Sequence, residues 1–229
     1  MGQKGLFEPL TLRGLTFSNR LWVSPMCQYS APLDGVAREW HHVHIGSFAT
    51  GGAGLIMMEA TGVLPEGRIS INCLGLWNDA QRDALKPIVE FAHAMGTKIG
   101  IQLAHAGRKG STMPPGSEHP FATVAEGGWS APAPSEIPFG KMPTPHAMST
   151  EEIKNTVAAF ATAAKRAVEA GFDLVEIHAA HGYLIHQFLS PISNTRSDEY
   201  GGSFENRTRF MIEIAAAVRP SARGELEIT

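Results

Sequence analysis

Two histidines and a tyrosine follow one apolar run in close succession and could do chemistry together. His178, His181 and Tyr183 come directly after residues 172–177, a strand-sized apolar stretch. Two neutral imidazoles can donate hydrogen bonds to one substrate oxygen and stabilise the negative charge that develops on it. A phenol close to them can supply a proton. These residues therefore predict a site that binds an oxygen atom and transfers a proton.

A metal site is the alternative for the same two histidines, because a spacing of three residues also suits metal ligands. A metal-dependent hydrolase of barrel fold needs further carboxylate or histidine ligands at other strand ends, where Glu59 and His105 are the spare candidates. If these residues have no function, the histidines are buried polar groups with hydrogen-bond partners inside the core, and Tyr183 only packs against its neighbours. Their clustering at a strand end, ahead of a segment rich in Gly, Asn, Arg and Asp, favours a functional site.

Three further side chains follow other predicted strands, namely Cys27, Ala60 and Gln102. Taken alone, Cys27 is typical of a small buried apolar residue and Gln102 of a polar cap. Parallel α/β proteins build their sites at the carboxyl ends of strands, so these positions are expected to share one end of the fold with the histidines.

Four strand and helix units are predicted to position these residues. The strands are 21–25, 55–59, 98–103 and 172–177, and the segments with helical period are 38–50, 79–95, 149–170 and 204–218. Repeated units of this kind form a parallel sheet with helical crossovers. Side chains at four strand ends favour a (β/α)8 barrel over an open sheet. Pro87 requires the second helix to begin near residue 86 or to kink there.

The whole chain, 1–229, is predicted to form a single α/β domain. Residues 1–20 are expected to form a hairpin, 108–146 a long excursion after the third strand, and 219–229 a divergent tail without a buried strand. A complete barrel typically needs about 250 residues, so four units predict the N-terminal half of one. The first and fourth strands would then be unpaired edges, which favours homo-oligomers or a complementary half-barrel as partner.

Composition points to small-molecule partners. The chain has 229 residues, of which 43% are hydrophobic and 18% charged, with a formal net charge of -3. The absence of a basic cluster argues against binding to nucleic acid or to an anionic membrane surface. Two cysteines cannot form a disulfide framework, and the first residues lack the apolar core of a signal peptide. We therefore expect a cytoplasmic protein without a membrane span.

Four motifs stand in an order that identifies a family. They are Pro-Met-Cys-Gln-Tyr-Ser at 25–30, Glu-Ala-Thr-Gly-Val at 59–63, Gly-Ile-Gln-Leu-Ala-His-Ala-Gly-Arg-Lys at 100–109, and the long block 178–207. Together they resemble the old yellow enzyme family, over about residues 6–218. The cysteine at position 27 resembles that of its thermophilic-like bacterial subgroup, the NADPH-dependent ene-reductases.

The resemblance implies a (β/α)8 barrel that binds FMN at the carboxyl ends of its strands. Cys27 would lie near the reactive edge of the flavin and tune its potential, and Gln102 would hydrogen-bond the pyrimidine end. The whole set implied for the cofactor is Ser24, Pro25, Met26, Cys27, Ala60, Gln102 and His178. No metal is implied.

The resemblance also implies a ping-pong reaction in which NADPH or NADH reduces FMN and the flavin hydride then reduces an activated C=C bond of an enone or nitroalkene. His178 and His181 would bind the carbonyl or nitro oxygen, Tyr183 would protonate the carbon, and Tyr29 would line the substrate pocket. Catalytic roles therefore fall on Tyr183, His178, His181 and Cys27.

The similarity stops after residue 218. The family continues there into a fifth strand with an arginine that stabilises reduced flavin, and barrels commonly bind phosphate with loops after the seventh and eighth strands. We therefore expect a fragment, a shifted reading frame near Arg219, or a chain that needs a complementary half. Three hypotheses remain: an FMN-dependent ene-reductase, a non-catalytic remnant or assembly partner of the same ancestry, and a metal-dependent barrel hydrolase.

Overall fold

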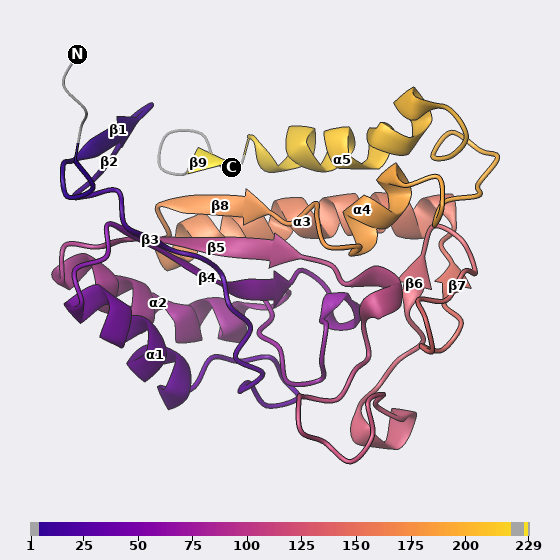
Figure 1. Cartoon of the computed structure of the whole chain (residues 1–229), viewed down its shortest axis with the longest axis horizontal. Coiled ribbons are helices and arrows are strands. Elements are labelled where there is room, and N and C mark those ends of the chain that lie inside the picture. The colour runs from indigo at the N-terminus through magenta and orange to yellow at the C-terminus, as the bar shows by residue number, and fades with distance from the viewer. Residues whose placement is uncertain (1–4, 221–226, 229) are drawn as a thin grey trace.

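A parallel sheet covered by helices on one face forms the body of the protein (Figure 1). The computed structural model describes residues 5–220 and 227–228. The sheet has the order β3-β4-β5-β8-β9, and every neighbouring pair is parallel. Its strands are β3 Trp22–Val23, β4 Leu55–Gly62, β5 Lys98–Ala104, β8 Leu174–Ile177 and β9 Glu227–Ile228.

The helices follow one another around the outer face of this curved sheet, each in contact with the next. They are α1 Glu39–Thr50, α2 Asp79–Ala94, α3 Thr150–Ala170 and α5 Phe204–Val218. Alternate residues of the strands, such as Ile56 and Met58 of β4, join the apolar faces of these helices in the main core. This arrangement is the succession of βα units that the sequence predicts.

The N-terminal hairpin and the long excursion lie at opposite ends of the sheet (Figure 1). The hairpin pairs β1 Leu10–Leu12 with β2 Leu15–Phe17, as predicted. The excursion holds only short elements: η2 Gly107–Lys109, η3 Val124–Glu126, and the parallel pair β6 Pro132–Ala133 and β7 His146–Ala147. A further turn, η1 Pro65–Gly67, follows β4, and a short helix that was not predicted, α4 Leu184–Leu189, follows β8.

Helix α2 begins at Asp79 and continues through Pro87, so of the two expected alternatives a start near residue 86 is wrong, and the kink stays a prediction. The Asn78 side chain accepts a hydrogen bond from the Gln81 backbone N–H at 3.0 Å, and Gln81 Oε1 accepts one from the Asn78 backbone N–H at 3.1 Å. This capping box satisfies the first turn, and the proline removes one donor further along. Local capping therefore outweighs the unfavourable proline.

The fourth strand is not an unpaired edge, which corrects the sequence-based expectation. Leu174 and Val175 of β8 pair in parallel with Glu227 and Ile228 of β9. A two-residue pairing needs only backbone groups, so a segment without an apolar run can still form it. Residues 221–226 and 229 of the predicted tail lie outside the described part of the chain.

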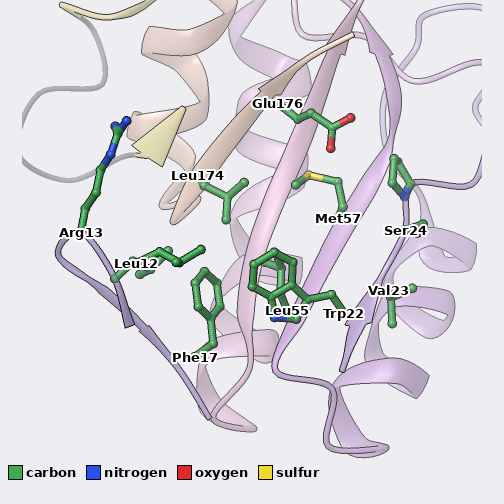
Figure 2. A pocket seen from close by; sticks show the side chains of 12 residues that line it. Leu12, Arg13, Phe17, Trp22, Val23, Ser24, Leu55, Met57, Leu174 and Glu176 are labelled. Atoms are coloured by element: carbon green, nitrogen blue, oxygen red, sulfur yellow. The ribbon is translucent and has the colours of Figure 1, made fainter. Parts of the chain in front are cut away.

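The inner face of the sheet carries a hollow of about 430 Å³ beneath the hairpin (Figure 2). Leu55, Met57 and Leu174 form its floor, and Phe17 of the hairpin packs against them. Trp22 at the rim keeps 40% of its surface exposed. An inner face that is apolar and only partly covered is what the N-terminal half of a barrel has, because the inward side chains of a closed barrel are its core.

Among residues 5–220 and 227–228, no helix is long and apolar enough to cross a membrane.

Candidate active site

Side chains from three neighbouring strands form one row on the inner face of the sheet. A bulge at Glu59 shifts the register of β4, so that Ala60 pairs with Gln102 of β5, which in turn pairs with Glu176 of β8. Side chains at paired positions point to the same face, and Glu176 lines the inner hollow (Figure 2). The bulge therefore aligns two residues predicted to contact the flavin.

The Gln102 amide is held by a carboxylate. Its Nε2 donates a hydrogen bond to Glu176 Oε1 at 2.5 Å, and the side chain is buried. One N–H and the carbonyl oxygen of the amide remain for a ligand. Ala60 beside it is small and buried, so no bulky side chain stands next to the donor and acceptor of Gln102 on this row. These features fit the ring of FMN, whose pyrimidine end both donates and accepts hydrogen bonds.

The segment after β3 borders this row. Ser24 and Pro25 line the inner hollow, whereas Met26 is 47% exposed and lines a small cavity towards α1. The backbone N–H of Gln28 donates to Glu59 Oε2 at 3.0 Å, which ties the segment to the bulge of β4.

Cys27 carries an acidic thiol in this segment. A hydrogen bond from Cys73 is the largest effect that lowers the pKa of Cys27 to about 7, together with the backbone N–H of Ala60 and the Tyr29 hydroxyl, and against burial, which raises it. The same contact and burial raise the pKa of Cys73. A thiol of this kind is partly thiolate near neutral pH. Ala60 and Tyr29 thus lie close to Cys27.

The His178 ring contacts both His181 and Tyr183. The His178 ring lies 5.0 Å from the His181 ring and 5.1 Å from the Tyr183 ring, between centroids, both edge to face. His178 Nδ1 accepts the N–H of Ala180 at 3.4 Å, so the proton of the neutral ring resides on Nε2. Burial, followed by His181 and Lys109, lowers the pKa of His178 to about 4. The imidazole is therefore neutral at pH 7 and can donate through Nε2.

Tyr183 is likewise a protonated phenol at pH 7. Burial, followed by Cys27 and Cys73, raises the pKa of Tyr183 to about 12. Burial, Cys27, Cys73 and Tyr183 in turn raise the pKa of Tyr29. Cys27 and Cys73 thus act electrostatically on both phenols, although Tyr29 follows β3 and Tyr183 follows β8. Tyr183 can act there as a proton donor.

Two residues that sequence analysis missed hold the loops of the site. Gln187 of α4 is buried; its Nε2 donates to the carbonyl oxygens of Ala106 at 3.1 Å and Gly182 at 2.8 Å, and its Oε1 accepts the N–H of Arg108 at 3.2 Å. Lys109 Nζ donates to the carbonyl oxygen of His181 at 2.8 Å. Both link the loop after β5 to the loop after β8. The apolar spacing of Leu184, Ile185 and Phe188 was the available signal for α4.

The ligands that a metal-dependent hydrolase needs do not come together. In the described ranges 5–220 and 227–228, no group of three or more His, Cys, Asp or Glu side chains is placed to hold a metal ion. The spare candidate Glu59 faces His41 of α1, with 3.7 Å between Oε1 and Nε2. His105 is fully buried, which lowers its pKa to about 3, and its Nδ1 accepts the N–H of Gly107. The donor set thus gives the hydrolase alternative no support.

Comparisons with known proteins agree on one family. The sequence model of the NADH:flavin oxidoreductase / NADH oxidase family matches residues 5–228, so the expectation that the similarity stops after residue 218 is wrong. The chain is 52% identical over 223 residues to the NADH:flavin oxidoreductase FG08077 of Gibberella zeae, covering 95% of this chain and 54% of that protein. It is 51% identical over 223 residues to an NADPH dehydrogenase of Geobacillus thermodenitrificans, covering 96% and 61%.

Solved structures give the same result. Morphinone reductase in complex with tetrahydroNAD matches with a TM-score of 0.84 at 35% identity, over 99% of this chain and 63% of that one. Old Yellow Enzyme from Pichia sp. AKU4542 matches with a TM-score of 0.87 at 31% identity, over 99% and 59%. The fold is therefore the N-terminal part of a (β/α)8 barrel, and the chain spans about half to three fifths of the length of these relatives.

Proposed function

The chain belongs to the NADH:flavin oxidoreductase / NADH oxidase family, which includes old yellow enzyme, and from this premise we propose that it provides the flavin and substrate site of an FMN-dependent ene-reductase. The substrates proposed are enones and nitroalkenes, with NADPH or NADH as reductant. The observation that carries the proposal is the contact of His178, His181 and Tyr183 at the end of β8, beside the acidic thiol of Cys27.

The residues divide the work between cofactor and substrate. Gln102 would hold the pyrimidine end of FMN, over the floor made by Ala60, with Ser24 and Pro25 at one side and Met26 and Cys27 beyond them. When bound, FMN would supply the hydride that it has accepted from the nicotinamide. Cys27, being partly thiolate near pH 7, would place negative charge near the ring and tune its potential.

The substrate oxygen would lie between the two imidazoles. Because Nδ1 accepts a hydrogen bond, the neutral His178 ring carries its proton on Nε2, which can donate to a carbonyl or nitro oxygen and stabilise the negative charge that develops there. His181 would add the second donor. Tyr183 would give its phenolic proton to the neighbouring carbon, and Tyr29, beside it, would line the pocket.

We also propose that the inner face of the sheet is covered in the assembled protein, by another copy or by a complementary half-barrel. The partly exposed Trp22 and the apolar floor of the hollow support this proposal. Sedimentation should show a species larger than one chain; a stable monomer at micromolar concentration contradicts it. We place the protein in the cytoplasm, where the neighbouring thiols of Cys27 and Cys73 would stay reduced.

The reductase proposal is tested by supplying FMN, NADPH and 2-cyclohexenone to the purified chain and following NADPH consumption and product under exclusion of oxygen. We expect turnover of the enone, and Tyr183→Phe should slow enone reduction at least tenfold while flavin reduction by NADPH continues. Tyr200→Phe, which removes a hydroxyl that is bonded to Glu213 of α5, is the matched control. A chain that takes up FMN but never reduces the enone refutes the proposed reaction. A colourless chain that takes up no FMN favours the non-catalytic hypothesis.

A further inference from the structure

We infer that Lys109 is a positioning residue of this site, which fixes the turn that carries His181 and Tyr183 and joins it to the long excursion through Phe139. The structural role of Lys109 stands independently of the proposed function. Only its expected effect on enone reduction rests on that function. Lys109 ends the turn η2, directly after the third strand motif, whereas the residues that it holds follow β8.

The turn after β8 has a backbone conformation that needs support. His181 has φ 57° and Gly182 has φ 72°, so two successive residues are in the left-handed region, and the first has a side chain. Lys109 Nζ donates to the carbonyl oxygen of His181 at 2.8 Å. Its stem lies along Gly182, where an added Cβ would meet Lys109 Cδ at 3.7 Å. The lysine thus stabilises the conformation that presents His181.

The ammonium group lies over two aromatic rings. Lys109 Nζ is 4.8 Å from the centroid of Phe139 and 4.8 Å from that of Tyr183. Both distances suit cation–π attraction, which strengthens with burial. Phe139 belongs to the excursion between β5 and α3, so one cation joins the excursion to the proposed proton donor. Lys109 Nζ thus has the His181 carbonyl oxygen and the two rings as partners.

The positive charge also acts on the oxygen-binding histidine. Lys109 is among the groups that lower the pKa of His178, after burial and His181. Burial, followed by Arg108, lowers the pKa of Lys109. A partly buried charge is screened less by water than an exposed one. A cation here favours the neutral, donating form of His178 and would stabilise negative charge that develops on a substrate oxygen. The position of Lys109 therefore affects the conformation of the turn at His181, and its charge affects the pKa of His178. The two effects can be measured separately.

Lys109→Met tests the inference, because methionine keeps most of the stem and removes the donor and the charge. The primary readout is an NMR titration of the His178 ring in the chain without added flavin, where His181, Lys109 and Tyr183 are the groups that face it. We expect the pKa of His178 to rise by about half a unit or more in Lys109→Met. The amide signals of Gly182 and Tyr183 should shift as well. Lys109→Arg should restore both, and Lys165→Met, on the exposed face of α3, should change neither.

The same variants separate this inference from the proposed reaction. If the chain reduces enones, Lys109→Met should lower kcat/KM for the enone by about tenfold to a hundredfold and leave flavin reduction by NADPH within twofold. If no variant reduces enones but the His178 titration shifts, the proposed function fails and the positioning role stands. An unchanged His178 titration and unchanged turn signals in Lys109→Met overturn the inference, whatever the activity.

Discussion

Replacing the buried carboxyl of Glu59 by an amide should make the protein more stable at alkaline pH. Glu59 sits in the bulge of β4 with 4% of its surface exposed, accepts the N–H of Gln28, and faces His41. Burial raises the pKa of Glu59 to about 8, Cys27 adds to this effect, and the Gln28 hydrogen bond opposes it. The uncharged acid is therefore the form that the fold favours, and Glu59→Gln imitates it.

The sign and size follow from the difference between the folded and unfolded pKa values. The pKa is 4.5 without the fold and about 8 within it, so the folded state holds the proton more tightly. The contribution of Glu59 to the stability of the folded state is fully present below pH 4.5. It is lost as the pH rises from there through the folded pKa of about 8. At about 1.4 kcal/mol for each pH unit, the loss is on the order of 5 kcal/mol by pH 9. Glu59→Gln should not show this loss, because its amide does not titrate.

The assay is urea unfolding of the wild type and Glu59→Gln at intervals from pH 5 to pH 9, compared as a difference at each pH. Neighbouring groups such as His41, whose pKa burial lowers, titrate in both proteins, so their common contribution cancels in the difference. What remains is the titration of Glu59 with its interaction with Cys27. The advantage of the variant should grow steadily between pH 5 and 8 and then level off. Glu90→Gln, at an exposed position of α2, controls for the loss of one carboxylate. A difference that is constant across this range would refute the reasoning.

Three further outcomes are expected. Cys73→Ala removes the hydrogen bond to the Cys27 thiolate, so the midpoint of the pH dependence of Cys27 alkylation should move upward from about 7; an unmoved midpoint contradicts the role of Cys73. Asp173→Asn weakens the contacts of this residue with a histidine, a lysine and a backbone N–H, so it should lower the free energy of unfolding by about 3 kcal/mol. Urea unfolding at pH 7 measures this decrease, and a decrease below about 1 kcal/mol would contradict it. Gly75→Ala would put a Cβ into the Trp77 ring and should lower stability by about 1–3 kcal/mol; an unchanged midpoint would show that the ring moves freely.

Local signals explain why the sequence predicted so much of the fold. Helix α5 matches its predicted range, 204–218, because Ser203 caps its first turn and Pro220 follows its end. Helix α3 has a capping box at Ser149 and ends at Gly171, whose φ of 94° suits glycine. Motifs that depend on neighbouring residues are complete within a short stretch of chain, so single-sequence analysis can find them.

Features that depend on pairing between distant segments were not predictable in this way. The bulge that aligns Ala60 with Gln102 exists only in the register of β4 with β5, and β9 forms through two backbone pairings. Lys109 and His181 meet across 72 positions of sequence. The family resemblance pointed to Cys27, His178 and Tyr183, but it did not point to the groups that hold them. Whether all the predicted residues contact flavin and substrate stays a prediction.

The affinity of the chain for FMN tests the central proposal most directly. FMN fluorescence is titrated with wild type, Gln102→Ala and, as a control for amide removal, Asn155→Ala on the exposed face of α3. The wild type and Asn155→Ala should quench FMN to the same saturating extent, and Gln102→Ala should bind about tenfold more weakly, because it loses the donor and acceptor at the pyrimidine end. No quenching by the wild type, or equal affinity for Gln102→Ala, would contradict the proposal that the row formed by β4, β5 and β8 holds the flavin.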